Sequence, residues 1–217
     1  MNRSSHETVQ RVAQDKRQLI LDAATHVFAE KGYHGSRISD IACEAGIAYG
    51  LVYHYFKNKE EILNSIFGEQ WTVFLEAVRQ IASGSQATEQ KLLAIAELIL
   101  NAHRVRSDWV KVLVFEIQRS QRFAQPDRLR AVSELFRLVG QIFRQGQKSK
   151  TLRQDIDPDL ACAVFMGGLD IMVTNSVLPQ TVKPSPSSND GSHYQEVAQA
   201  VVEIFLGGML GEEAGRR

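Results

Sequence analysis

The chain has 217 residues, and its 25 Lys and Arg balance its 25 Asp and Glu, so it carries no net charge at pH 7. This length allows a substantial buried core, while the balanced charge excludes the overall positive field that marks many nucleic-acid-binding proteins. Residues 1–60 hold eight basic and seven acidic side chains, so any DNA-binding site must be local.

The sequence has no segment typical of export, membrane insertion or metal binding. Residues 1–13 are polar and lack the apolar stretch of a signal peptide. The longest apolar stretch, residues 160–173, contains Asp170 and is shorter than the about 20 residues that a membrane span requires. Cys43, Cys162 and the six histidines show no spacing of a disulfide framework or metal site. We therefore expect a cytoplasmic protein without cofactor, metal or membrane association.

Three short helices are predicted at the start of the chain. Apolar residues recur at helical spacing almost throughout, and alternating strand-like runs are absent, so the expected fold class is all-α. An apolar stripe over residues 19–28 ends at Lys31 and Gly32, which is typical of a helix C-terminus. A second helix is expected over residues 38–45 and a third over residues 49–55.

Six longer helices are predicted to follow. Asn58 and Glu61 have the spacing of a capping box at the start of a helix that runs to Ser83. The others are expected at residues 88–104, 107–121, 126–147, 158–178 and 194–210, with a loop over 179–192. Asp157 and Pro158 form a helix-start pair. We place a domain boundary in the fourth helix, which divides the chain into an N-terminal domain, 14–62, and a C-terminal domain, 63–217.

The second and third helices match a helix-turn-helix, because Gly46 allows the sharp turn between them. Periodicity alone also fits an ordinary helical bundle. Residues 32–63, GYHGSRISDIACEAGIAYGLVYHYFKNKEEIL, resemble the DNA-binding segment of the TetR family of bacterial transcriptional regulators in the IA-x-x-AG turn, the G-x-x-Y helix and the YF-x-x-KEE-x-L segment. The resemblance covers about the first 70 residues. It implies about nine helices, with an N-terminal three-helix DNA-binding domain and a C-terminal helical domain that binds ligand and dimerises.

Eight residues of this segment are predicted to contact DNA: Ser36, Arg37, Tyr49, Gly50, Leu51, Tyr53, His54 and Lys59. Residues near the start of the second helix are expected to meet phosphate oxygens together with the unpaired helix N–H groups. Tyr49 heads the recognition helix, where it reaches a base edge or methyl group, and Gly50 permits close backbone approach. The resemblance implies that Tyr53 and Lys59 are the strongest phosphate contacts. The core residues that hold the two helices together are expected to be Ile41, Ala42, Val52 and Phe56.

Two residues of the recognition helix depart from the family pattern. Ala48 stands where the family usually has a Ser or Thr N-cap, whose loss costs about 1 kcal/mol of local stability. Leu51 stands where a small polar residue is usual. Because leucine forms no hydrogen bond, it either contacts thymine methyl groups or excludes water.

Eight residues are candidates for an effector pocket: Phe67, Trp71, Phe74, His103, Trp109, Phe115, Phe136 and Asp170. The aromatic residues are equally typical of a plain hydrophobic core. Basic residues occur near the ends of two successive predicted helices: His103, Arg104 and Arg106 in the fifth, and Arg119 and Arg122 in the sixth. They either gather around an anionic ligand or serve as cations at helix C-termini. Asp170 accepts a hydrogen bond from a ligand or partner subunit, or is a satisfied structural acid.

The last two helices are predicted to form a two-fold dimer interface. Candidate interface residues are Gly167, Gly168, Val201 and Phe205. Two glycines inside a helix are unfavourable by about 1 kcal/mol each relative to alanine, which close packing against another helix offsets.

The leading hypothesis is a repressor that binds a palindromic DNA operator as a homodimer and leaves it when a small-molecule effector binds. The segment AYGLVYHYF resembles regulators of fatty-acid metabolism, which implies a hydrophobic acid or acyl thioester as effector. One alternative is an activator, or a regulator controlled by a protein partner. Another is a small helical enzyme or binding protein with an incidental helix-turn-helix, although no catalytic motif supports an enzyme.

Overall fold

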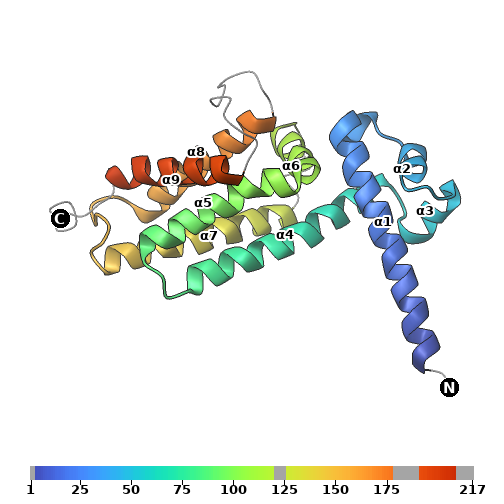
Figure 1. Ribbon diagram of the computed structural model, residues 1–217, viewed down its shortest axis with the longest axis horizontal. Helices are drawn as coiled ribbons and strands as arrows, with labels where there is room; N and C mark the ends of the chain where they lie inside the picture. The colour runs from blue at the N-terminus through green and yellow to red at the C-terminus, as the bar shows by residue number, and fades with distance from the viewer. Residues whose placement is uncertain (1–2, 120–125, 178–190, 209–217) are drawn as a thin grey trace. The chain divides into compact units, whose positions relative to one another are not determined.

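The computed structural model describes residues 3–119, 126–177 and 191–208 (Figure 1). Within these ranges, the side chains outside the description are those of residues 3–12, 103, 114–119, 126–128, 175–177 and 191–193. Helices make up all the elements of the described residues: α1 Arg3–Gly35, α2 Ile38–Glu44, α3 Tyr49–Tyr55, α4 Lys59–Ser83, α5 Thr88–Val105, α6 Ser107–Arg119, α7 Pro126–Lys148, α8 Pro158–Val177 and α9 Gly191–Gly207. The predicted all-α fold is confirmed. The loop predicted over residues 179–192 lies largely outside the described residues.

Helix starts follow the capping signals in the sequence. Asp157 Oδ1 accepts the backbone N–H groups of Asp159 and Leu160, at 2.9 and 2.8 Å, at the start of α8. At the start of α4, Asn58 Oδ1 accepts the N–H of Glu61 at 2.8 Å. The Glu61 carboxylate accepts the N–H of Lys57 at 2.7 Å, one residue before the position that a capping box uses.

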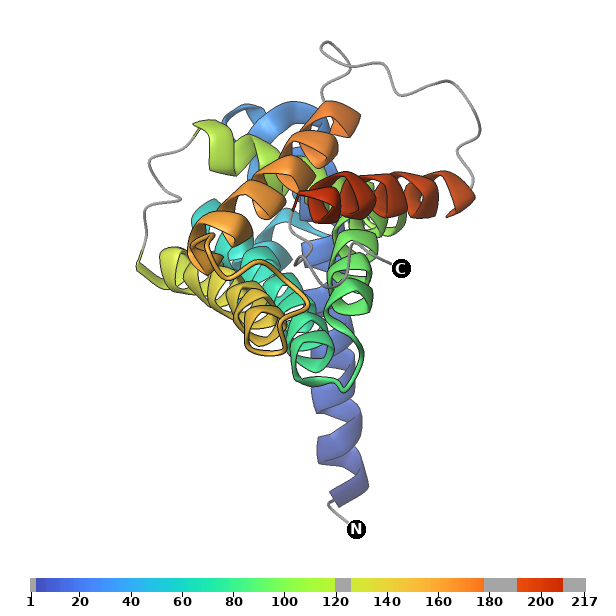
Figure 2. The ribbon, with the colours of Figure 1, turned by 90° about the vertical axis from the view of Figure 1, so that its left-hand side faces the viewer.

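Helix α1 is longer than the apolar stripe predicted. The helix begins at Arg3. Residues 3–18 carry no apolar stripe, so the sequence pattern did not predict this part of the helix. At Gly32 the backbone is non-helical, with φ 69° and ψ 158°, a conformation that suits glycine. Figures 1 and 2 both show the N-terminal part of α1 extending beyond α2 and α3.

Contacts divide the chain into two compact units. The N-terminal unit comprises residues up to Trp71 together with Asp108–Gln118, and the C-terminal unit comprises Thr72–Ser107 and the residues from Arg119 onward. Helix α4 therefore contributes to both units, and α6 belongs to the N-terminal one. The boundary expected between residues 62 and 63 stays a prediction.

In the N-terminal unit, α6 is tied to α1 by charged side chains. His26 Nδ1 lies 2.9 Å from Asp108 Oδ2, and Lys111 Nζ lies 3.5 Å from both Glu30 Oε1 and Asp108 Oδ1. The hydrogen bond to Asp108 is the main cause that raises the pKa of His26, and the charges of Asp108, Glu44 and Glu30 add to it. The ion pair therefore holds α6 against α1 most firmly when His26 is protonated.

The C-terminal unit is a bundle in which α9 packs against α5 and α7 packs against α8. Figure 2 shows α9 lying across α5. Phe143, Phe165 and Phe205 form an aromatic cluster with ring centroids 5.3 to 5.9 Å apart. The buried Lys91 donates to the carbonyl of Ala82 at 3.0 Å and to Gln145 Oε1 at 3.1 Å, so it joins α5 to the end of α4 and to α7.

The pair between His26 and Asp108 should make stability depend on pH. Because folding raises the pKa of His26, the stabilisation is complete below the unfolded pKa of about 6.5 and is lost as pH rises through the folded pKa. We expect urea unfolding to show His26→Gln less stable than the wild type at about pH 5.5, with the difference vanishing by about pH 8. His34→Gln, at an exposed position at the end of α1, is the control. A difference for His26→Gln that is the same at both pH values would contradict this.

Candidate nucleic-acid interface

Helices α2 and α3 form a helix-turn-helix held together by a small apolar core. Between them, Gly46 has φ +63°, its N–H donates to the carbonyl of Cys43 at 3.1 Å, and the N–H of Ile47 donates to that of Ala42 at 3.0 Å. The four residues predicted to be core are all buried, with exposures from 0 to 4%: Ile41, Ala42, Val52 and Phe56. The apolar side of α3 is therefore fixed against α2, which leaves the opposite side free.

Two tyrosines dominate the exposed side of α3. Tyr49 is 53% and Tyr53 is 47% exposed, their rings meet edge to face with centroids 5.3 Å apart, and their hydroxyls lie 3.2 Å apart. The hydrogen bond between the hydroxyls is the main cause that raises the pKa of Tyr53. The Tyr53 phenol is therefore held in its neutral, hydrogen-bonding form, which suits contact with an anionic partner.

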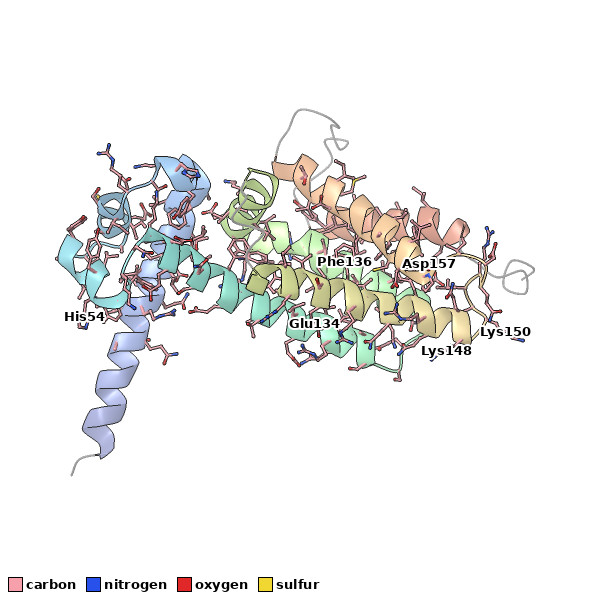
Figure 3. All side chains as sticks on the ribbon, turned by 180° about the vertical axis from the view of Figure 1, so that it is seen from behind. His54, Glu134, Phe136, Lys148, Lys150 and Asp157 are labelled. Atoms are coloured by element: carbon pink, nitrogen blue, oxygen red, sulfur yellow. The ribbon has the colours of Figure 1, made fainter. Side chains whose placement is uncertain are left out.

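The other predicted DNA contacts of α3 differ in exposure. Gly50 is exposed, with no atom within 4 Å of the position that a Cβ would occupy. His54 is exposed at the outer edge of α3 (Figure 3). Leu51 is only half-exposed, so it lies at the margin of this face. Ala48 occupies the N-cap of α3 and provides no side-chain hydrogen bond, as its sequence predicts.

The structure corrects the prediction for Ser36. This side chain is 3% exposed, and its hydroxyl donates to the carbonyl of Gly32 at 2.6 Å, with that of Val27 3.3 Å away. The hydroxyl is therefore turned into α1 and does not reach a phosphate. Arg37, which is exposed, takes the N-cap position of α2, and its N–H donates to Asp40 Oδ2 at 2.8 Å.

Lys59 occupies a different environment from a free phosphate-binding lysine. Its Nζ donates to the carbonyl of Tyr33 and, at 2.7 Å, to that of Ser36, and it lies 4.4 Å from the centroid of the Tyr33 ring. Lys59 thus joins the start of α4 to the turn between α1 and α2. The position of Lys59 in the family motif indicated a charge near DNA, but no sequence pattern indicated these carbonyl contacts.

Sequence reasoning also missed a second tie between the first two helices. Lys31 Nζ lies 3.0 Å from Asp40 Oδ1, and this contact, together with the N–H of Arg37, lowers the pKa of Asp40. The two residues are nine positions apart across an irregular turn, so helical spacing does not pair them. This ion pair and Lys59 fix α2 on α1.

The predicted effector residues fall into both units. In the N-terminal unit, Phe67, Trp71 and Trp109 are buried, with exposures from 6 to 9%. In the C-terminal unit, Phe74 is half-buried, while Phe136 is 39% exposed on α7 (Figure 3).

The remaining effector candidates are Asp170, His103 and Phe115. Asp170 lies on the exposed face of α8, and partial burial raises the pKa of its carboxyl group. The side chains of His103 and Phe115 lie outside the described residues. The pocket therefore stays a prediction.

The predicted dimer residues lie on α8 and α9. Gly167 is exposed and Gly168 half-buried, with no atom within 4 Å of either Cβ position. Val201 and Phe205 are half-buried. The ring of Phe205 lies 5.7 Å from that of Phe143 and 5.3 Å from that of Phe165 of the same chain. Phe205 therefore belongs to an aromatic cluster within its own subunit, and its part in a dimer interface stays a prediction.

Neither a metal-ion site nor a membrane-spanning helix is found among the described residues. No group of three or more His, Cys, Asp or Glu in that part of the chain is placed to hold a metal ion. None of its helices combines the length and apolar character that crossing a membrane requires.

Comparison with known proteins agrees with this geometry. Residues 20–66 match the family "Bacterial regulatory proteins, tetR family", and residues 67–184 match "YsiA-like protein, C-terminal region". The fatty acid metabolism regulator protein of Bacillus subtilis is 31% identical over 165 residues, which cover 73% of this chain and 82% of the relative. The transcriptional repressor KstR2 of Rhodococcus jostii is 32% identical over 153 residues, which cover 67% of this chain and 72% of the relative.

A solved structure extends the similarity over both units. The regulator FadR from Bacillus subtilis, crystallised in complex with stearoyl-CoA, superposes with a TM-score of 0.67 at 26% identity, covering 88% of this chain and 98% of that one. The two family matches together cover the helix-turn-helix and most of the C-terminal helices. The chain therefore belongs to the tetR family of bacterial regulatory proteins, and it is a DNA-binding transcriptional regulator and not an enzyme.

Proposed function

We propose that this chain is a cytoplasmic repressor that binds a palindromic operator as a homodimer and releases it when a long-chain acyl-CoA binds. The observation that carries the DNA-binding part is the exposed pair of Tyr49 and Tyr53 on a helix whose other side is fixed by buried residues. The effector is suggested by the solved relative in complex with stearoyl-CoA.

The exposed residues divide into two kinds of DNA contact. Tyr49 and Gly50, at the start of α3, are placed to approach base edges in the major groove. Tyr53, His54 and Arg37 carry exposed donors that suit phosphate oxygens. Since phosphate contacts carry no sequence information, the base preference depends mainly on the first turn of α3.

Lys59 acts here by positioning. Its ammonium group is engaged by two backbone carbonyls and an aromatic ring, so moving it to a phosphate would leave those carbonyls without this donor. Its removal should loosen the turn between α1 and α2, which positions the recognition helix. Arg37 is exposed. It serves as the comparison for Lys59, because we expect its guanidinium group to contact phosphate directly.

Salt dependence separates these two roles. Arg37→Ala should reduce the slope of log K against log salt by about 1, because one phosphate contact and its released counterion are lost. Lys59→Ala should leave the slope unchanged, lower operator affinity and lower the melting temperature, because a structural contact is lost. Titration of operator DNA at several salt concentrations, with melting curves, measures both. A slope reduced by about 1 in Lys59→Ala with an unchanged melting temperature would assign Lys59 to phosphate.

The dimer is supported by an exposed apolar face on α8. Leu160, Val164 and Ile171 are 59, 58 and 49% exposed, and they lie on the same helical face as Gly167. Space above both glycines is open within the subunit, so the cost of two glycines inside the helix is not offset by close packing there. A second copy of α8 would fill that space and cover the apolar face, with the two-fold symmetry that a palindromic operator requires.

Charge on this face should separate the subunits. Val164→Asp places a carboxylate where the partner helix is expected, and burying it unpaired is strongly unfavourable. We expect sedimentation at micromolar concentration to show a dimer for the wild type and a monomer for Val164→Asp. Val73→Asp, at a position on α4 that is 67% exposed, is the control and should remain dimeric. If Val164→Asp sediments as a dimer, this face of α8 is not the interface.

Effector and operator binding should be reciprocal. If an acyl-CoA weakens operator affinity by a given factor, the operator weakens acyl-CoA affinity by the same factor. The operator is first obtained by selection from random duplex DNA, and stearoyl-CoA is then titrated calorimetrically into the free protein and into its operator complex. We expect at least tenfold weaker binding to the complex. Equal affinities would exclude stearoyl-CoA as the inducer, because a ligand without differential affinity shifts no equilibrium.

A further inference from the structure

The indole of Trp109 on α6 carries a buried donor without an acceptor. The residue is 6% exposed, and its Nε1–H makes no hydrogen bond in the part of the chain that the structure describes. Leaving a buried donor unsatisfied costs about 1–3 kcal/mol. Because native proteins satisfy nearly all such groups, this donor needs a partner that the described residues do not provide.

The apolar environment of the ring does not require an indole. The neighbouring Val110 and Val112 are each 2% exposed, so this part of α6 is buried, and phenylalanine would fill much of the same space without the cost of the N–H. The ion pairs of Asp108 with His26 and of Lys111 with Glu30 hold α6 to α1 on either side of Trp109 in sequence. A turn of the helix that brings the indole to solvent would break them.

We propose that Trp109 Nε1–H donates a hydrogen bond to the thioester carbonyl oxygen of the bound acyl-CoA, and this rests on the effector proposed above. The carbonyl supplies the one acceptor that the indole lacks. Phe67 and Trp71 are buried aromatic residues of the same unit, and we expect them to provide an apolar setting for the alkyl chain. A free carboxylate would lose its hydration there in return for one neutral donor, so the thioester is preferred to the fatty acid.

This contact would place the effector on a helix that reaches the DNA-binding helices directly. Helix α6 is held on α1 through His26 and Asp108, and α1 in turn holds α2 through Lys31 and Asp40. A ligand hydrogen-bonded to Trp109 is therefore attached to a helix that contacts α1 directly. A ligand held only by its alkyl chain would lack this directional contact.

The test combines one substitution with one change in the ligand. Trp109→Phe keeps an aromatic ring and removes the donor together with part of the ring volume. Calorimetric titration should show a five- to tenfold loss of affinity for stearoyl-CoA, the effect expected for one hydrogen bond of about 1 kcal/mol. The S-octadecyl thioether of CoA, which lacks the carbonyl, should bind wild type and variant alike, so that the two changes are non-additive. Stearate should bind the wild type more weakly than stearoyl-CoA.

The comparison between the two ligands separates the lost hydrogen bond from lost packing. Loss of ring volume in Trp109→Phe acts on both ligands alike, whereas loss of the hydrogen bond acts on stearoyl-CoA alone. Equal loss of affinity for the thioester and the thioether would therefore overturn the proposal. If the wild type and Trp109→Phe bind stearoyl-CoA equally well, the proposed role of Trp109 is wrong, while the proposed effector stands. If the wild type does not bind stearoyl-CoA, the proposed effector fails with it.

Discussion

The placement of the recognition helix depends on the ammonium group of Lys59 between the carbonyls of Tyr33 and Ser36. These carbonyls belong to the turn that follows the non-helical Gly32, where regular helical hydrogen bonds are interrupted. A cation on the first residue of α4 provides donors there and joins three segments at one point. With Ser36 and the pair of Lys31 and Asp40, it determines where α2 begins.

The exposed face of α3 follows from this fixed turn. Val52 and Phe56 are buried against α2 and its neighbours, so Tyr49 and Tyr53 must point outward at helical spacing. The missing cap at Ala48 weakens the start of this helix, and the contact between the two tyrosines stabilises the same turn. The residues proposed to bind DNA therefore also support the local structure of the free protein.

Helix α6 is the element through which we propose that effector binding reaches the DNA-binding helices. In sequence it lies between α5 and α7, which belong to the C-terminal unit, yet its contacts group it with α1. Its charged residues Asp108 and Lys111 make those contacts, and its buried Trp109 carries the unsatisfied donor. The same short helix thus combines a link to α1 with a polar group suited to a ligand.

Local signals in the sequence determined the helices, their caps and the family. Apolar periodicity, Gly46, Asn58 and Asp157 act over a few residues, so they can be interpreted without knowing the fold. The buried set of Ile41, Ala42, Val52 and Phe56 followed from the same periodicity. The DNA-contact motif likewise indicated the exposed Tyr49, Tyr53 and Arg37.

Only the tertiary structure decided the roles of residues whose partners are distant in sequence. Ser36 faces α1, Lys59 contacts carbonyls 23 and 26 positions earlier, and Phe205 joins an aromatic cluster with Phe143 and Phe165. The hydrogen bond of His26 with Asp108 spans 82 positions. Hydrogen bonds and ring contacts of this kind depend on which helices pack together, and periodicity within one helix does not contain that information.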